Sequence, residues 1–322
     1  MKLKTFLALI AVLAFSACGN NNTGESNNDN NSDSPPSVEA QAPTEVPAQT
    51  LKDLSYATVS SAEKLDLYVP AGTGPFPVVI YVHGGGFVHG DKSQPFKQGI
   101  VDRMIQEGYA VASVNYRLSG EALFPAGIQD IKASVRWLRA NSQQYRLDPK
   151  RFSAWGDSAG GNLVSLLGTS CGDANLEGAD LGNAEQSSCV QAVIDWYGPN
   201  DFLQMDQEFI DSGSTCSSSH NSPNSPESNY MGFPIQDDPV AVEKANPITY
   251  ISSGDPTFFI QHGTADCKVP PQQSQLLYDA LLPVLGAGKV TLTYMDGWEH
   301  GDPRFITPEN LGLVVEFLNQ HL

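Results

Sequence analysis

Apolar runs alternate with amphipathic stretches along most of the chain beyond residue 50. Residues 77–82 and 109–114 are continuous apolar, β-branched runs, which suits strands that are buried on both faces. Residues 126–145 carry apolar side chains at helical spacing, which predicts a helix with one buried stripe. The further predicted strands are 65–69 (as an outer strand), 191–197, 257–261 and 290–295, and the further helices are 94–108, 272–285 and one from 309 onward. Strands that alternate with helices predict an α/β fold with a mostly parallel sheet covered on both faces.

The N-terminus has the composition of a targeting segment. It starts with basic residues, continues with an unbroken apolar run at 6–15 and ends in small residues. An apolar run of this length is too short to span a bilayer, so residues 1–17 are predicted to be a signal peptide. Cys18 follows directly, and the arrangement resembles the lipobox of bacterial lipoproteins, in which this cysteine is lipidated. Ordinary secretion, with Cys18 incidental, is the alternative.

The next segment, residues 18–50, has the composition of a tether. It is crowded with asparagine, serine and proline, and it contains acidic residues but no lysine or arginine. Such a segment cannot bury enough apolar surface to order itself. Residues 51–322 remain as the body, which is enough for one large α/β domain. We therefore expect an exported bacterial lipoprotein, held at the outer membrane or cell surface only through its N-terminal lipid anchor.

The charge balance limits the possible partners. The chain carries a formal net charge of −18, whereas nucleic acids and other polyanions require a basic surface. We therefore expect no nucleic-acid partner. A neutral small molecule or a carbohydrate is compatible with this charge.

The cysteines predict two disulfide bonds. Apart from Cys18, the chain has four cysteines, and an even number in an exported protein indicates disulfide pairing. Of the three possible pairings, we expect Cys171 with Cys189, which closes a Gly/Asn/Ser-rich loop, and Cys216 with Cys267. Free buried thiols are the alternative.

A serine between glycines is the first candidate for chemistry. Residues 156–160 read Gly-Asp-Ser-Ala-Gly, after an apolar run at 152–155 and before a helix-like stretch at 163–167. This is the pattern of a nucleophile elbow, a turn so sharp that only small residues let the strand and the helix pass. It would lift the Ser158 hydroxyl clear of the sheet. A Gly/Ser-rich turn without chemistry is the alternative when this motif stands alone.

A glycine-rich loop supplies the second candidate. Residues 83–87 read His-Gly-Gly-Gly-Phe and follow the predicted strand 77–82. Consecutive glycines let backbone N–H groups point at a ligand, as acyl transfer requires when a carbonyl oxygen gains negative charge. We predict an oxyanion hole formed by the amides of Gly85, Gly86 and Ala159.

A serine nucleophile needs a base, and the base needs a carboxylate that holds its tautomer. Of the six histidines, His300 lies on the loop between the last predicted strand and the last helix, at the same sheet edge as Ser158. Asp266 follows the strand 257–261 at that edge, whereas Asp255 precedes it. Glu299 is the alternative carboxylate. The order Ser158, Asp266, His300 is that of α/β-hydrolases.

These motifs together carry a family resemblance. Residues 83–86 and 156–161 resemble the hormone-sensitive-lipase-like branch of α/β-hydrolases. Bacterial carbohydrate and feruloyl esterases are more similar still, at residues 81–87, 115–118, 195–199 and 262–266. The resemblance covers nearly all of residues 51–322. It implies the α/β-hydrolase fold and hydrolysis of short-chain or carbohydrate-linked (acetyl or feruloyl) esters through an acyl-enzyme, without a metal or an organic cofactor.

An insertion separates this chain from many of those relatives. Residues 201–246 are rich in serine, proline and asparagine and stand where insertions cover the active site. We interpret the segment as a cap, and a surface excursion is the alternative. Phe87 and Trp298 are predicted to contact substrate, and the insertion's aromatic side chains are predicted as acyl or aryl contacts, namely Phe202, Phe209, Tyr230 and Phe233.

Two other function classes remain open at this point. A serine peptidase of the prolyl-oligopeptidase type has the same triad order, but such enzymes usually carry a large additional domain. A non-catalytic binding lipoprotein on a hydrolase scaffold has typically lost a triad residue, whereas all three candidates are present here.

Overall fold

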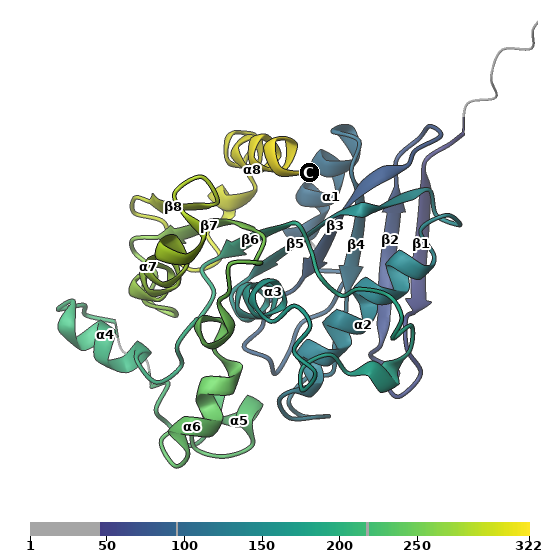
Figure 1. Cartoon of the computed structure of the whole chain (residues 1–322). Coiled ribbons are helices and arrows are strands. Elements are labelled where there is room, and N and C mark those ends of the chain that lie inside the picture. The colour runs from purple at the N-terminus through teal and green to yellow at the C-terminus, as the bar shows by residue number, and fades with distance from the viewer. Residues whose placement is uncertain (1–45, 95, 217–218) are drawn as a thin grey trace, which may run out of the picture. The chain divides into compact units, whose positions relative to one another are not determined.

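The computed structural model describes residues 46–94, 96–216 and 219–322. The expected signal peptide, Cys18 and nearly all of the expected tether lie outside the described residues. Figure 1 shows a central sheet with helices packed on both of its faces. This is the α/β-hydrolase architecture that the sequence predicts.

The sheet has eight strands in the order β1-β2-β4-β3-β5-β6-β7-β8. The strands β1, β2 and β4 pair antiparallel, and all pairs from β4 through β3 to β8 are parallel. Their bounds are β1 Gln49–Ser55, β2 Lys64–Val69, β3 Phe76–Val82, β4 Ala110–Val114, β5 Leu147–Asp157, β6 Ala192–Trp196, β7 Thr257–Gly263 and β8 Val290–Met295.

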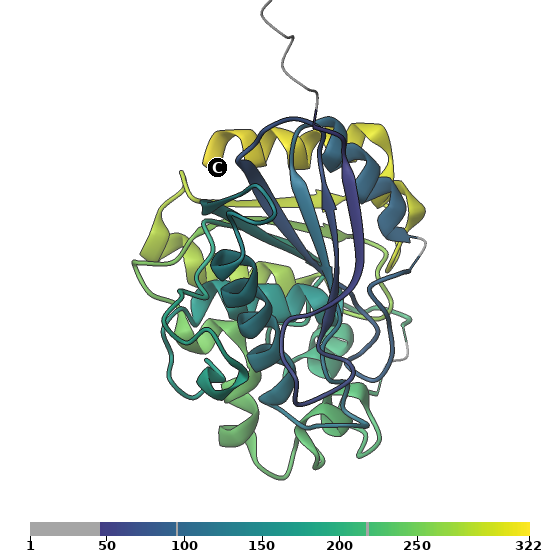
Figure 2. The same ribbon diagram turned by 90° about the vertical axis from the view of Figure 1, so that its right-hand side faces the viewer.

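Two hydrophobic layers flank the sheet because successive residues of a buried strand face opposite sides. On β3, Val78 and Ile80 join the core beneath three helices, whereas Val79 and Tyr81 join the core beneath the other two. The first set is α2 (Ala126–Ala140), α3 (Ala159–Thr169) and α7 (Gln272–Leu285), and the second is α1 (Phe96–Gln106) and α8 (Pro308–His321). Figure 2 shows α1 and α8 together on one side of the sheet.

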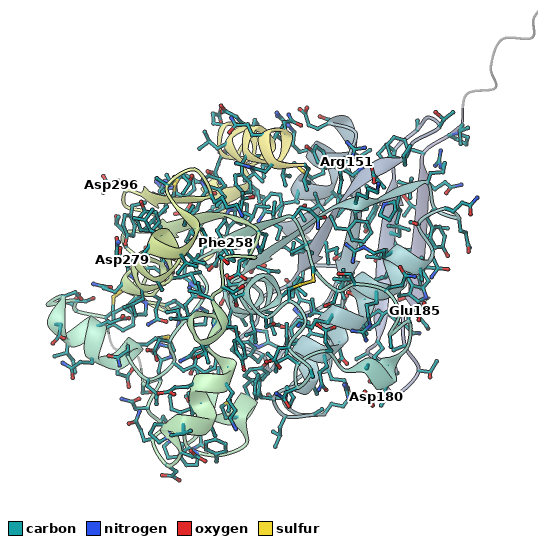
Figure 3. All side chains as sticks on the ribbon, in the orientation of Figure 1. Arg151, Asp180, Glu185, Phe258, Asp279 and Asp296 are labelled. Atoms are coloured by element: carbon teal, nitrogen blue, oxygen red, sulfur yellow. A yellow bond between two sulfur atoms is a disulfide. The ribbon has the colours of Figure 1, made fainter. Side chains whose placement is uncertain are left out.

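The side-chain distribution follows the same layers. Phe258 of β7 is buried in the interior, whereas Asp279 and Asp296 are exposed at the periphery (Figure 3). Among the described residues, no helix combines the length and the apolar character that a membrane span requires.

The insertion at 201–246 forms short helices outside the two main layers. They are α4 (Met205–Asp211), α5 (Pro226–Met231), α6 (Pro239–Val242) and a 3₁₀ turn at Glu243–Ala245. Figure 1 shows α4, α5 and α6 at the lower left, beyond the sheet and its covering helices. Helices this short are marginal on their own in water, so their packing against the body must stabilise them.

Two sequence expectations about the first strands were wrong. The strand predicted as outermost, now β2, is an interior strand with mostly buried side chains, and the edge is β1. Strand β1 begins at Gln49, so the folded body starts before residue 51. Its mostly exposed polar sequence lacks the apolar run by which the other strands are recognised.

The helix predicted over 126–145 was also too long. Helix α2 ends at Ala140, and Asn141 is its C-cap residue, with its backbone amide and its side-chain amide both donating to the Trp137 carbonyl. The following residues form turns that lead into β5.

Candidate active site

Ser158 stands at the turn between β5 and α3, at the carboxyl edge of the parallel strands. Its backbone has φ 55° and ψ −122°, a conformation that a non-glycine residue rarely adopts. The Ser158 amide donates to the Trp196 carbonyl of β6 at 2.9 Å, which holds the turn against the sheet. A Cβ on Gly156 would collide with the Gly160 carbonyl, so the crossing of strand and helix requires glycine.

The structure brings together the three side chains that the sequence singles out. His300 Nε2 lies 2.9 Å from Ser158 Oγ, and His300 Nδ1 lies 2.7 Å from Asp266 Oδ2. His300 comes from the loop after β8, and Asp266 comes from the loop after β7. The alternative carboxylate, Glu299, is exposed, and no hydrogen bond joins it to the His300 ring among the described residues.

Asp266 is surrounded by hydrogen-bond donors. Its Oδ1 accepts from the amides of Lys268 at 2.7 Å and Val269 at 3.0 Å. Its Oδ2 faces His300 and also His262 Nε2 at 3.3 Å. Burial raises the pKa of this carboxyl, but the hydrogen bonds from His262 and His300 outweigh burial and bring the pKa well below its usual value. Asp266 is therefore ionised at neutral pH, as a carboxylate that orients an imidazole must be.

His262 is a contact of Asp266 that the sequence reasoning treated only as a structural hydrogen-bonder. Its Nδ1 lies 2.7 Å from Ser274 Oγ, and its Nε2 lies 3.1 Å from the Val269 carbonyl. Because that carbonyl only accepts, Nε2 carries the proton, which also points toward Asp266. The signal in the sequence is the spacing of four residues from His262 to Asp266 across a strand end.

Tyr197 is a second neighbour that the sequence did not reveal. Its ring lies 4.7 Å from the His300 ring and 4.7 Å from the Phe305 ring, so it packs between them. The residue has φ 45°, another strained position at a strand end. Tyr197 thus packs against the His300 ring in a T-shaped contact.

The glycine loop lies against the elbow. Asp157 Oδ1 accepts from Tyr81 Oη at 2.5 Å and from the Gly84 amide at 3.2 Å, which ties the start of the loop to the residue before Ser158. Gly85 has φ 119° and Gly86 has φ 58°. A Cβ on Gly85 would collide with the His89 carbonyl, so this loop shape requires glycine there.

A cavity of about 720 Å³ opens at Ser158. Its walls come from the glycine loop, the elbow, the two loops that carry Asp266 and His300, and the insertion. The predicted oxyanion residues Gly85, Gly86 and Ala159 all line it together with Ser158 and His300. The insertion contributes the lining residues Ser219, His220, Ser222, Asn224, Ser225, Pro226 and Glu227. The insertion therefore forms one wall of the cavity, as expected of a cap.

The predicted aromatic contacts are mostly absent from this cavity. Trp298 is not a lining residue, because its ring packs at 4.8 Å on Phe305 with the Arg304 guanidinium over it. Phe87 lines the cavity, but its ring is buried and stacks on Tyr230 at 4.1 Å. The insertion's aromatic residues are likewise not lining residues, and the expectation was wrong for Phe202, Phe209, Tyr230 and Phe233.

Both predicted disulfide pairings are present, and both are drawn in Figure 3. Cys171 bonds to Cys189 across a separation of 18 residues. Cys216 bonds to Cys267 across 51 residues, and Cys267 directly follows Asp266. The second disulfide therefore joins the insertion to the loop that carries the carboxylate. Among the described residues, no group of three or more His, Cys, Asp or Glu side chains is arranged to hold a metal ion.

Solved structures share this fold. A bifunctional GH43-CE protein of Bacteroides eggerthii superposes with a TM-score of 0.75 at 32% identity, over 84% of this chain and 35% of that one. A truncated form of a carbohydrate esterase from gut microbiota gives a TM-score of 0.75 at 28% identity, over 84% of this chain and 95% of that one.

Sequence comparisons agree with the fold. Esterase LipQ of Mycobacterium tuberculosis is 30% identical over 259 residues, which is 77% of this chain and 56% of LipQ. The chain spans about half the length of the curated relatives LipQ, LipM and LipC. The BD-FAE family matches residues 65–281, a stretch that includes Ser158 and Asp266 and ends before His300. Since this match covers more than half of the chain, the protein belongs to the BD-FAE family.

Proposed function

We propose that this chain is a serine carboxylic-ester hydrolase that acts through Ser158, His300 and Asp266. The observation that carries the proposal is the continuous hydrogen-bonded relay from Asp266 through His300 to Ser158 Oγ, at one end of a cavity that the glycine loop also lines. A hydroxyl within hydrogen-bond reach of an imidazole, itself oriented by an ionised carboxylate, is the arrangement that activates a serine. The family membership and the named esterases among the relatives support the same reaction.

In the acylation step, Ser158 Oγ attacks the ester carbonyl carbon and His300 Nε2 takes the hydroxyl proton. The carbonyl oxygen becomes an oxyanion, which the amides of Gly85, Gly86 and Ala159 stabilise. The C–O bond to the alcohol then breaks, and His300 gives its proton to the leaving alkoxide. Asp266 stays ionised and stabilises the imidazolium that exists between the two proton transfers.

In the deacylation step, water takes the place of the alcohol. His300 accepts a proton from this water as it attacks the acyl carbon, and the same amides stabilise the second oxyanion. Breakage of the acyl–Oγ bond, with return of the proton from His300, releases the acid and restores Ser158. Every proton in the cycle passes through His300 Nε2, and besides water the scheme uses only the three triad side chains and the amides of Gly85, Gly86 and Ala159.

For the substrate, we propose short-chain or carbohydrate-linked esters, with acetyl or feruloyl acyl groups. The gut carbohydrate esterase and the GH43-CE protein, to which this chain is similar over 84% of its length, support this class. The polar wall that the insertion contributes to the cavity supports it too.

The test is hydrolysis of p-nitrophenyl acetate by the wild-type chain and by Ser158→Ala. We expect the substitution to lower kcat by at least about 10⁴-fold without loss of the fold, because triad residues act as a unit. Near-wild-type turnover by Ser158→Ala would end the proposal. Peptide substrates test the peptidase alternative, and failure of a fluorophosphonate to label the protein would favour a non-catalytic binding protein.

We further propose that Cys18 is lipidated and tethers the enzyme to a bacterial membrane. The small residues before Cys18 and the polar segment after it support this proposal. Cys18→Ser should move the enzyme from the membrane fraction to the soluble fraction of the cells that express it. Unchanged membrane association of Cys18→Ser would contradict the anchor.

A further inference from the structure

One carboxylate in the cavity wall has no part in the proposed chemistry. Glu227, at the start of α5, is only 4% exposed although it lines the cavity with Ser158 and His300. Its Oε1 lies 3.1 Å from His220 Nδ1, and its Oε2 is buried and accepts no hydrogen bond from the described residues. A buried carboxylate that lacks donors is costly, so a hydroxyl that enters the cavity and reaches this side chain would be favourable.

His220 is the neighbour of this carboxylate. The His220 Nε2 lies 2.9 Å from the Lys268 carbonyl, which only accepts, so Nε2 carries a proton. The Nδ1 faces Glu227 and attracts it only when it is protonated too. Burial lowers the pKa of His220, but Glu227 and Asp206 outweigh burial and raise the pKa above its usual value. The pair therefore offers an acceptor carboxylate with an imidazole neighbour at 3.1 Å.

The pair is anchored to the loop that carries Asp266. The Lys268 carbonyl contacts His220, while the Lys268 amide donates to Asp266 Oδ1 at 2.7 Å. The Cys216–Cys267 disulfide makes a second connection between the insertion and the same loop. Glu227 thus sits at a set position relative to His300. His300 protonates the leaving alcohol in the proposed reaction, and Glu227 lines the same cavity as His300.

The rest of the insertion wall is mostly polar. Apart from Pro226, its lining residues are short hydroxyl and amide side chains, namely Ser219, Ser222, Asn224 and Ser225. Such side chains can exchange hydrogen bonds with a group that presents several hydroxyls.

We propose that Glu227, held by His220, determines specificity by accepting a hydrogen bond from a hydroxyl on the alcohol part of the ester. The inference rests on the proposed esterase function and assigns its alcohol side to a sugar or another polyol. A site built to bond a substrate hydroxyl discriminates strongly against analogues without it, because the buried acceptor is then left unpaired. Glu227 takes no part in bond making.

The test compares wild type and Glu227→Gln on two esters with the same acyl group, an acetylated sugar and p-nitrophenyl acetate. We expect kcat/KM on the acetylated sugar to fall about 10-fold or more, mainly through KM, because a neutral acceptor replaces a charged one. On p-nitrophenyl acetate, which has no hydroxyl on its alcohol part, we expect less than a twofold change. The p-nitrophenyl acetate arm also reports that the variant is folded.

Glu243→Gln is the matched control, since Glu243 lies in the same insertion, is exposed and does not line the cavity. It should leave both substrates unchanged. Three outcomes would overturn the inference. In two of them, Glu227→Gln lowers kcat/KM equally on both esters or lowers it on neither. In the third, the wild-type protein cleaves p-nitrophenyl acetate but no sugar ester. Two further esters test which group Glu227 binds. A loss of activity of Glu227→Gln that is confined to methyl ferulate would place the bonded group on the acyl part of the ester. A loss confined to acetylcholine would indicate that Glu227 binds a cation. If wild type cleaves no ester at all, the proposed function itself has failed.

Discussion

The two walls of the cavity are built in opposite ways. At the rim of the sheet, Asp266 receives two backbone amides and two imidazoles, and both nitrogens of His300 have partners. In the insertion wall, Glu227 Oε2 and His220 Nδ1 are buried without a hydrogen bond among the described residues. Side chains whose hydrogen bonds are all satisfied are held in one geometry, which is what catalysis requires. In the proposal, a ligand hydroxyl completes the wall that carries Glu227, so the two walls divide catalysis from recognition.

Their supports differ too. The rim is fixed by strand ends, with Ser158 and Tyr197 held in strained conformations that the sheet enforces. The insertion consists of short helices joined to the rim by the Cys216–Cys267 disulfide and by the His220 contact to Lys268. We therefore expect changes at the rim to affect all esters alike, and changes in the insertion to affect esters selectively.

The largest expected effect that tests this division is at Asp266. Asp266→Asn should lower kcat by about 10⁴-fold on every ester, because an amide no longer fixes the His300 tautomer or stabilises its charge. Steady-state kinetics on p-nitrophenyl acetate measures it. Glu299→Gln is the control and should change kcat less than twofold. A large loss in Glu299→Gln with activity retained in Asp266→Asn would reverse the assignment of the carboxylate.

The second effect concerns the glycine loop. Gly85→Ala places a Cβ against the His89 carbonyl at a residue with φ 119°, so the loop must move and its amides with it. We expect kcat to fall by about 10²–10³-fold, the loss typical of one missing oxyanion donor. Gly312→Ala is the control, because its Cβ would meet nothing within 4 Å on α8. It should keep full activity and gain roughly 0.5–1 kcal/mol of stability. Wild-type turnover by Gly85→Ala would exclude the loop from catalysis.

The disulfides give an intermediate effect that separates the two walls. Replacing Cys216 and Cys267 by serine should lower the free energy of unfolding by about 2–4 kcal/mol and reduce the preference for sugar esters severalfold. Replacing Cys171 and Cys189 should lower stability by about 1 kcal/mol less, since its loop is shorter, and should leave ester preference unchanged. Thermal unfolding and the ester panel provide both measurements. If both double variants lost the preference for sugar esters equally, the division of the cavity into a catalytic rim and a recognition wall would be contradicted.

The smallest effect contrasts two carboxylates. Asp266 is ionised at neutral pH, whereas burial raises the pKa of Glu208 on α4 to about 7, although the Gln273 side chain donates to it at 2.8 Å. The folded state then binds a proton that the unfolded state has released, so this carboxyl lowers stability as pH rises from about 4.5 to 7. Because Glu208 is partly exposed, we expect this loss of stability to be about 1 kcal/mol. Urea unfolding at pH 5 and at pH 8 measures how far the free energy of unfolding changes between the two pH values. Glu208→Gln should reduce this change by about 1 kcal/mol. An identical pH dependence in both proteins would contradict this assignment.

The scaffold was predictable because its signals are local and strong. Continuous apolar runs indicated the parallel strands, and the end of each strand then indicated which edge His300 and Asp266 would share. Strand β1 was not predicted because its sequence is polar, and it is positioned by pairing with β2 rather than by burial of apolar side chains.

The insertion was predictable only as a cap. Its aromatic residues were expected in the cavity, but Tyr230 and Phe202 pack with Phe87 in the core instead. A serine- and proline-rich sequence has no periodicity that says which side chains turn inward, so tertiary packing decides. The Glu227–His220 pair lies seven positions apart in such a segment, and no spacing rule would join them.

The most direct test of the central claim is to find where an ester-mimicking reagent attaches. After treatment with a fluorophosphonate, digestion and mass spectrometry should place a single phosphonyl adduct on Ser158, formed much more slowly in His300→Ala. An adduct on another residue, or ester hydrolysis that continues while Ser158 stays unmodified, would contradict the account.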